Sequence, residues 1–264
     1  GSKGTGDHEI FSIEKLEGVI IGTDGSWEEN VATMKQAAVD GLLDTYFDSS
    51  QKDGAYVGYD LGKNNRAYVY ELRFAPRNGM PQRMVGGVFQ GANKMDFSDA
   101  ETLYTVTFTP EEGKYTHIKL SSTGKKFRYL RYMSPKGGFC NVAEVQFYGR
   151  KVSLKEQTID FPELGVVEEG IADFSPKATA TSGLPVTYSS SKTDVATIVN
   201  GKIHVVGPGN TYIVAYQNGN EEWGEATPVN GFRTLQDIRR CFISKSPPNN
   251  NFRFSVTFCS NICR

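Results

Sequence analysis

The chain lacks the features that mark several large classes of protein. It has no run of about 18 apolar residues, so no segment is predicted to span a bilayer. Its 29 basic and 30 acidic residues nearly cancel, which argues against a partner held mainly by charge, such as nucleic acid or a membrane surface. Asn-x-Ser/Thr sequons are also absent, which is compatible with a bacterial source. Residues 1–9 resemble a leader or tag remnant rather than an export signal.

Catalytic signatures are missing as well. No pair of carboxylates can be assigned to a cleft for glycoside hydrolysis, and no Ser or Cys stands beside an identifiable base. The glycine pairs at 86–87 and 137–138 lack the spacing and the strand-to-helix setting of a phosphate-binding loop. The histidines, His8, His117 and His204, are in the leader, on an alternating strand and in a predicted hairpin. The sequence therefore predicts a protein that is not an enzyme.

Cysteine is scarce and concentrated at one end. Cys241, Cys259 and Cys263 lie in the segment 237–264, which is rich in basic residues and fits neither strand pattern of the preceding chain. They lack the paired short spacing of a zinc site, and one disulfide would leave an odd thiol. We expect this segment to be an altered reading frame or an unrelated extension, poorly packed against the rest. Cys140 is expected to be a small buried packing residue.

What the chain does contain is a succession of short β-type segments separated by glycine-rich turns. There are 28 glycines and many Thr, Tyr, Val and Phe positions, with little helical periodicity. This pattern predicts an all-β protein built as sandwiches. The stretch 127–149 shows it best, since two alternating strands flank a loop with Pro135, Gly137 and Gly138. That loop is expected to hold Phe139 near solvent on a stiff base.

Five ordered segments of the first half resemble one known family. They supply an opening turn, an Asp-Gly…Thr turn, an Asp-Leu-Gly strand, a Pro-Arg strand and a closing pair of strands, at 18–23, 38–47, 56–62, 72–79 and 128–149. Together they resemble a factor V/VIII type C (discoidin-like) domain, the fold that family 32 carbohydrate-binding modules also use. The resemblance covers residues 10–150 and implies a galactose-binding-like jelly-roll β-sandwich.

A second unit is predicted after a short charged linker at 151–154. From 155 to 236 the chain alternates as strands, and Asn200-Gly201 lies between two β-rich runs. Both residues tolerate the positive φ of a type I′ turn, so the segment 196–206 is predicted to be a hairpin. The unit resembles a smaller bacterial immunoglobulin-like β-sandwich, a type of spacer found in secreted multimodular proteins.

The discoidin-like resemblance implies a structural calcium. In that family an aspartate carboxylate, a threonine, a glutamate and several main-chain carbonyls bind the ion, and hard oxygen ligands of this kind suit calcium. The matching side chains are Asp40, Thr45 and Glu144, and the matching carbonyls are those of Ala38, Leu42 and Ala143. The alternative is that Asp40 only caps a turn.

The residues expected to contact a ligand lie on predicted loops. They are Trp27, Phe47, Arg77, Asn78, Arg83, Phe139 and Asn141. A sugar offers hydroxyls to a forked donor and an apolar C–H face to an aromatic ring, so an arginine beside an exposed aromatic suits it. The resemblance matches Arg77 and Phe139 to the sugar-contacting arginine and aromatic of the family. The alternatives are that Arg77 only forms a salt bridge, and that Trp27 or Phe47 belongs to the core.

These expectations describe a non-catalytic, extracellular carbohydrate-binding module with an immunoglobulin-like spacer. The resemblance implies a galactose- or N-acetylhexosamine-type glycan as partner, and a parent that is a multimodular glycoside hydrolase or surface protein of a bacterium. The place implied is extracellular, at the cell surface or periplasmic. The alternative is a protein-docking or adhesion module on the same fold, for which a broad apolar patch would be expected.

Overall fold

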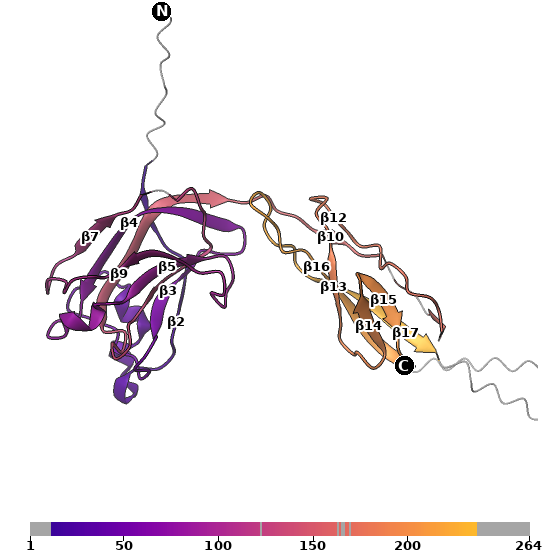
Figure 1. Ribbon diagram of the computed structural model, residues 1–264, viewed down its shortest axis with the longest axis horizontal. Coiled ribbons are helices and arrows are strands. Elements are labelled where there is room, and N and C mark those ends of the chain that lie inside the picture. Colours follow the sequence, from indigo (N-terminus) through magenta and orange to yellow (C-terminus); the bar gives the residue numbers. More distant parts are fainter. Residues whose placement is uncertain (1–11, 122, 163, 165–166, 169, 237–264) are drawn as a thin grey trace, which may run out of the picture. The chain divides into compact units, whose positions relative to one another are not determined.

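The computed structural model describes residues 12–121, 123–162, 164, 167–168 and 170–236. The chain divides into two compact units, of which the first comprises Gly1–Phe161, Ala178–Thr187 and Ala215–Val229 (Figure 1). The predicted leader and the predicted extension at 237–264, with His8 and three of the cysteines, lie outside the described residues. Within the described residues, every helix is too short and too polar to pass through a membrane.

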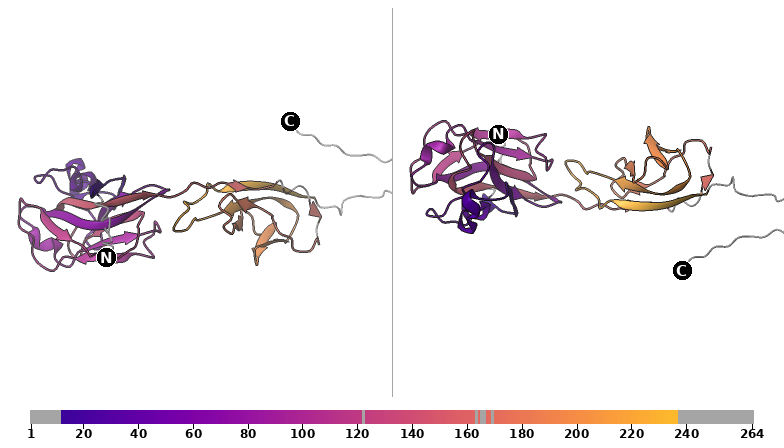
Figure 2. Two further views of the ribbon diagram at one scale, coloured as in Figure 1. Left: turned by 90° about the horizontal axis from the view of Figure 1, so that it is seen from above. Right: turned by 90° about the horizontal axis from the view of Figure 1, so that it is seen from below.

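The first unit is a sandwich of two antiparallel sheets, indigo to magenta in Figure 2. The four-stranded sheet has the order β1 (Glu14–Leu16), β9 (Val142–Ser153), β4 (Asn65–Pro76) and β7 (Thr116–Lys119). The five-stranded sheet has the order β2 (Val19–Gly22), β3 (Tyr56–Asp60), β8 (Tyr129–Met133), β5 (Val88–Ala92) and β6 (Glu101–Thr105). Short 3-10 segments connect them: η1 (Trp27–Glu29), η2 (Val31–Thr33), η3 (Lys35–Ala38) and η4 (Pro81–Met84). The predicted all-β, jelly-roll architecture is confirmed.

Alternation along the two longest strands explains why the sheets close on each other. In β4 and β9, Leu72 lies opposite Phe147 and Phe74 lies opposite Val145, and all four side chains are fully buried. The intervening residues turn to the outer face, as period-two strands require. Residues that lie opposite each other on paired strands form a rung, and each inward-facing rung therefore contributes one apolar pair to the layer between the sheets.

Aromatic rings fill the centre of that layer. Phe89 of β5 has its ring centroid 5.0 to 6.4 Å from those of Phe74, Tyr104, Tyr132 and Phe147. Such offset and tilted pairs stabilise a core beyond the area they bury. The core extends to the loop end of the sandwich through Cys140, which is fully buried, so the prediction of a buried packing cysteine is confirmed.

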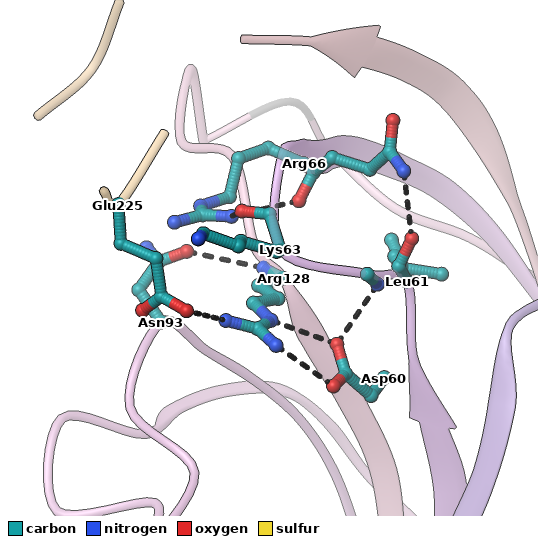
Figure 3. A network of polar contacts seen from close by, with 9 residues as sticks. Asp60, Leu61, Lys63, Arg66, Asn93, Arg128 and Glu225 are labelled. Carbon is teal, nitrogen blue, oxygen red and sulfur yellow. Dashed lines mark hydrogen bonds and ion pairs between the residues drawn. The ribbon is translucent and has the colours of Figure 1, made fainter. Parts of the chain in front are cut away.

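An ion pair fixes the end of the predicted Asp-Leu-Gly strand (Figure 3). The Arg128 guanidinium donates to both carboxylate oxygens of Asp60, at 2.8 and 3.0 Å, and the Gly62 amide donates to the same carboxylate at 2.8 Å. Arg128 also lies 3.5 Å from Glu225, which belongs to the same unit. Burial alone would raise the pKa of Asp60, but the bonds from Arg128 and Gly62 outweigh it and lower the pKa.

The remaining strands form three small sheets. One has the order β11 (Val167–Glu168), β17 (Val229–Gln236), β16 (Gly209–Tyr216) and β13 (Thr187–Ser190), another pairs β10 (Ile159–Asp160) with β12 (Thr179–Ala180), and the third pairs β14 (Ala196–Val199) with β15 (Lys202–Val205). The predicted hairpin at 196–206 is confirmed, because β14 and β15 pair antiparallel around Asn200 and Gly201. Both turn residues have positive φ, 50° and 74°, as a type I′ turn requires.

Candidate functional site

A pocket of about 230 Å³ opens among the loops of the first unit. Its walls come from four places in the sequence: the η1 segment, the loop between η3 and β3, the loop from the end of β4 through η4, and the loop between β8 and β9. The lining residues are Trp27, Asp48, Arg77, Met80, Arg83 and Phe139. The two arginines and two aromatics had been predicted from the sequence, and the structure brings them together in this pocket.

Asn141 does not line the pocket itself but contacts three of the residues that do. It is 1% exposed, and its amide nitrogen donates to Asp48 at 2.7 Å. Its amide oxygen accepts from Arg83 at 2.5 Å and lies 3.4 Å from Arg77. Asp48 in turn forms an ion pair with Arg77 at 2.5 Å. One buried amide therefore orients the carboxylate and both guanidinium groups, which is how a polar network fixes a binding geometry.

The aromatic side of the pocket is held by a tight loop. Phe139 and Cys140 have φ values of 52° and 48°, a left-handed conformation that costs ordinary residues free energy. Backbone bonds compensate, since the Ser49 amide donates to the Phe139 carbonyl at 2.8 Å and the Phe139 amide donates to Lys52 at 3.1 Å. At Gly138 a Cβ would lie 2.8 Å from the Arg83 carbonyl, so only glycine fits. The loop is thus a stiff mount for the Phe139 ring.

Two rings and one guanidinium meet at the rim. The Phe139 and Trp27 ring centroids are 5.8 Å apart at an interplanar angle of 88°, and the Arg83 guanidinium lies 5.0 Å from the Phe139 centroid. Trp27 is 51% exposed, so its ring belongs to the surface rather than to the core. The rim offers apolar ring surface beside charged donors, which is the combination that a pyranose with one apolar face can use.

The pocket is not lined by three of the predicted ligand residues, which are Phe47, Asn78 and the buried Asn141. Phe47 is fully buried in the core, because its ring points between the sheets while its backbone pairs with Val142, so it cannot touch a ligand. Asn78 is exposed but does not line the pocket. Asp48 and Met80, which do line it, were missed. Asp48 directly follows a buried aromatic residue and Met80 follows a glycine turn. Neither setting gives a sequence signal strong enough to single the residue out.

The salt bridge considered for Arg77 also exists. Its partner is Asp48, and the Arg77 guanidinium lies 4.0 Å from the centroid of the Tyr46 ring. Both charged side chains are largely buried, 21% and 12% exposed, yet both face the pocket. Structural pairing and ligand contact are therefore compatible, because a paired arginine keeps further N–H groups free to donate.

A second cluster gathers oxygens around Thr45. The Thr45 hydroxyl lies 2.9 Å from each Asp40 carboxylate oxygen and 3.4 Å from the carbonyl oxygens of Ala37 and Leu42. The Thr45 hydroxyl has one proton and can donate to only one of these four oxygens at a time. The other oxygens therefore lie close to the hydroxyl without a hydrogen bond from it. The Ala37 carbonyl belongs to the residue before the predicted Ala38. The Leu42 amide also donates to Asp40 at 2.9 Å, so Asp40 caps its turn as well.

Glu144 joins this cluster from β9. It is fully buried, accepts from the Gly41 amide at 2.5 Å and from Gln146 at 2.9 Å, and follows Ala143. Burial raises the pKa of Glu144, the two hydrogen bonds only partly oppose this, and the charge of Asp40 raises the pKa further. Two carboxylates, a hydroxyl and carbonyls are the oxygen donors that Ca²⁺ prefers, so these residues fit the ion.

Comparison with solved structures identifies the class of the first unit. The CBM62 module of Clostridium thermocellum Xyl5A is 46% identical, and the match covers 52% of this chain and 98% of that one with a TM-score of 0.51. The CBM32 of AlyQ in complex with 4,5-unsaturated mannuronic acid is 17% identical, with 51% and 97% covered and a TM-score of 0.40. A fucolectin from Morone saxatilis serum is 16% identical, with 52% and 47% covered and a TM-score of 0.40. No family model and no curated protein matches the chain.

The two-sheet sandwich of the first unit is therefore a carbohydrate-binding module with a galactose-binding-like fold. Because nearly the whole Xyl5A module matches at 46% identity, the chain belongs over about half its length to the family of that module, CBM62. The sequence resemblance had pointed to family 32, a related discoidin-like group.

Proposed function

We propose that the two-sheet sandwich of the first unit holds a glycan in the loop pocket without transforming it, and that residues 155–236 serve as an immunoglobulin-like spacer. The observation that carries this proposal is the convergence of Arg77, Arg83, Trp27 and Phe139 on one pocket of about 230 Å³. That space suits one sugar ring with its neighbour projecting into solvent. The arginines would donate to ring hydroxyls, and an aromatic ring would pack on the apolar C–H face.

The affinity of such a site is modest. A hydrogen bond from a charged group and a stacked aromatic each contribute about 1 to 3 kcal/mol. After the cost of association, this supports monovalent dissociation constants of about millimolar to tens of micromolar. Weak binding is useful in a tethered module, because several modules on one polymeric glycan gain avidity.

The setting we propose is a multimodular bacterial glycoside hydrolase or surface protein that works outside the cytoplasm. The 46% identity to a module of Xyl5A supports such a parent. We further propose that the oxygen cluster binds a structural calcium, with the side chains of Asp40, Thr45 and Glu144 and the carbonyls of Ala38, Leu42 and Ala143 as ligands. The Ala37 carbonyl, 3.4 Å from the Thr45 hydroxyl, is a further candidate. When bound, the ion would supply positive charge to buried carboxylates and tie the turn to β9.

A protein-docking function is the competing candidate. It would call for a broad apolar surface, whereas the pocket is small and has charged groups on its polar side. A glycan array that includes galactose-, N-acetylgalactosamine- and N-acetylglucosamine-terminated oligosaccharides tests between them. We expect retention of at least one of these classes. Absence of binding across the array would overturn the glycan proposal and favour protein docking.

A further inference from the structure

The outer face of the four-stranded sheet carries an unusual set of side chains. A sandwich sheet commonly turns short polar groups to solvent, but here three successive outward rungs are rich in tyrosine and basic residues. Each rung consists of residues that lie opposite each other on β1, β9, β4 and β7. The first rung has Arg150 and Tyr68. The second has Lys15, Tyr148, Glu71 and Lys119, and the third has Gln146, Arg73 and His117. The next rung, with Glu144, belongs to the oxygen cluster already described.

A β-bulge adds a further tyrosine to this face. The register of β4 against β9 shifts between Val69 and Glu71, so Tyr70 is the extra residue. Its ring lies parallel to that of Tyr68, with centroids 6.4 Å apart and an interplanar angle of 10°. Both tyrosines are half-buried, and neither hydroxyl has a hydrogen-bond partner among the described residues. Two aligned rings thus offer their hydroxyls to something outside the unit.

The third tyrosine is held in a fixed pose beside them. The Arg73 guanidinium lies 3.9 Å from the Tyr148 ring centroid, and Arg73 donates to Glu71 at 2.6 Å. The Tyr148 hydroxyl donates to Gln146 at 3.1 Å. A guanidinium stacked on a ring and tied to a carboxylate is pre-organised, so little side-chain entropy remains to be lost when a ligand binds.

The charge of the face is positive. Its three rungs carry Lys15, Arg73, Lys119 and Arg150, but Glu71 is their only carboxylate. Glu17 pairs with Lys15 at 2.8 Å from beside the face. Lys119 is exposed and makes no ion pair within the described residues. Positive potential over a flat surface attracts a polyanion.

We propose that this tyrosine face, defined by Tyr68, Tyr70, Arg73, Lys119 and Tyr148, binds an acidic polysaccharide, separately from the loop pocket. Outward rungs lie about 7 Å apart along a strand, so three rungs span about 14 Å, which suits a chain rather than one sugar ring. Ring faces and free hydroxyls suit pyranose units, and the basic residues suit their carboxylates. A protein partner would call for a more apolar centre.

Binding of polygalacturonate to the whole chain, measured by calorimetry, tests this proposal. At low salt, Lys119→Glu should weaken binding at least about five-fold, and the loss should shrink at about 1 M salt because the effect is electrostatic. The double variant Y68A/Y70A should weaken binding about ten-fold at both salt concentrations. Lys202→Glu, an exposed lysine on β15, is the matched control and should leave the affinity unchanged. Melting curves verify folding, and Lys119→Glu carries the test alone if the double variant unfolds.

The tyrosine face and the loop pocket can be separated by variant. An R77A/F139A protein should keep its affinity for polygalacturonate whether or not the wild-type pocket binds a neutral sugar. The proposal is overturned if polygalacturonate does not bind, if the face variants bind normally, or if R77A/F139A loses binding. It is also overturned if polyglutamate, which has the charge but no sugar rings, binds equally well, since that would indicate unspecific attraction of polyanions.

Discussion

Replacing Asn141 with alanine should damage the pocket and the stability of the first unit together. The substitution removes the bond to Asp48 at 2.7 Å and the bond from Arg83 at 2.5 Å, both to charged groups. Each such bond contributes about 1.5 to 3 kcal/mol, so full loss would cost about 3 to 6 kcal/mol. Because Asp48 is 12% exposed and Arg83 is half-buried, water can replace part of this, and we expect a loss of about 3 kcal/mol.

A loss of that size is readily measured by thermal unfolding. For a unit of this size, about 1 kcal/mol shifts the melting temperature by 2 to 4 °C, so we expect the transition of the first unit to fall by about 6 to 12 °C. Asn78→Ala is the matched control, since Asn78 is exposed on a neighbouring loop. It should shift the transition by less than about 2 °C. An Asn141→Ala protein with the melting temperature of wild type would refute the role of this amide in holding the polar side of the pocket.

Three further substitutions test other parts of the structure. Asp60→Asn should lower the melting temperature at pH 7, and the effect should shrink as pH falls below about 4. The reason is that the pKa of Asp60 is lower in the folded state, so the ionised carboxylate stabilises the fold at pH values above the pKa of the unfolded state and loses this effect when it is protonated. An equal effect at both pH values would contradict this. Calcium should raise the melting temperature more at pH 7 than at pH 5, because the raised pKa of Glu144 lets protons compete with the ion for the carboxylate. Asp40→Ala should abolish this response to calcium. A melting curve that chelator does not change would count against the site. Gly138→Ala should cost about 1 to 3 kcal/mol by overpacking against the Arg83 carbonyl, and a variant as stable as wild type in denaturant titration would show that the loop yields.

The sequence predicts the fold of the first unit well because the fold depends on local signals. Period-two alternation in 142–153 reports which residues turn inward, and the structure buries Val145 and Phe147 as that alternation requires. The Asn200-Gly201 turn is equally local, since the φ values it needs are available to few residue pairs. Such features need no knowledge of the partner strand.

The candidate site is predicted less completely because it depends on long-range contacts. Asp48 contacts Asn141 and Arg77, which lie far from it in the sequence, and nothing in its local sequence distinguishes it from another loop carboxylate. Phe47, next to it, is misassigned for the opposite reason, since a single aromatic in a loop gives no period from which burial can be read. Arg77 and Phe139 are found because they lie in motifs that a known family shares.

Calorimetric titration of the pocket variants with a neutral sugar is the most direct test of the central claim. The wild-type chain should bind galactose, N-acetylgalactosamine or N-acetylglucosamine, or an oligosaccharide ending in one of them. Arg77→Ala and Phe139→Ala should each weaken that binding several-fold or more, because each removes about 1 kcal/mol or more of contact. Phe108→Ala, which removes a ring that is 44% exposed outside the pocket, should bind like wild type. Sugar affinity that is the same in the wild type, Arg77→Ala and Phe139→Ala would contradict the account.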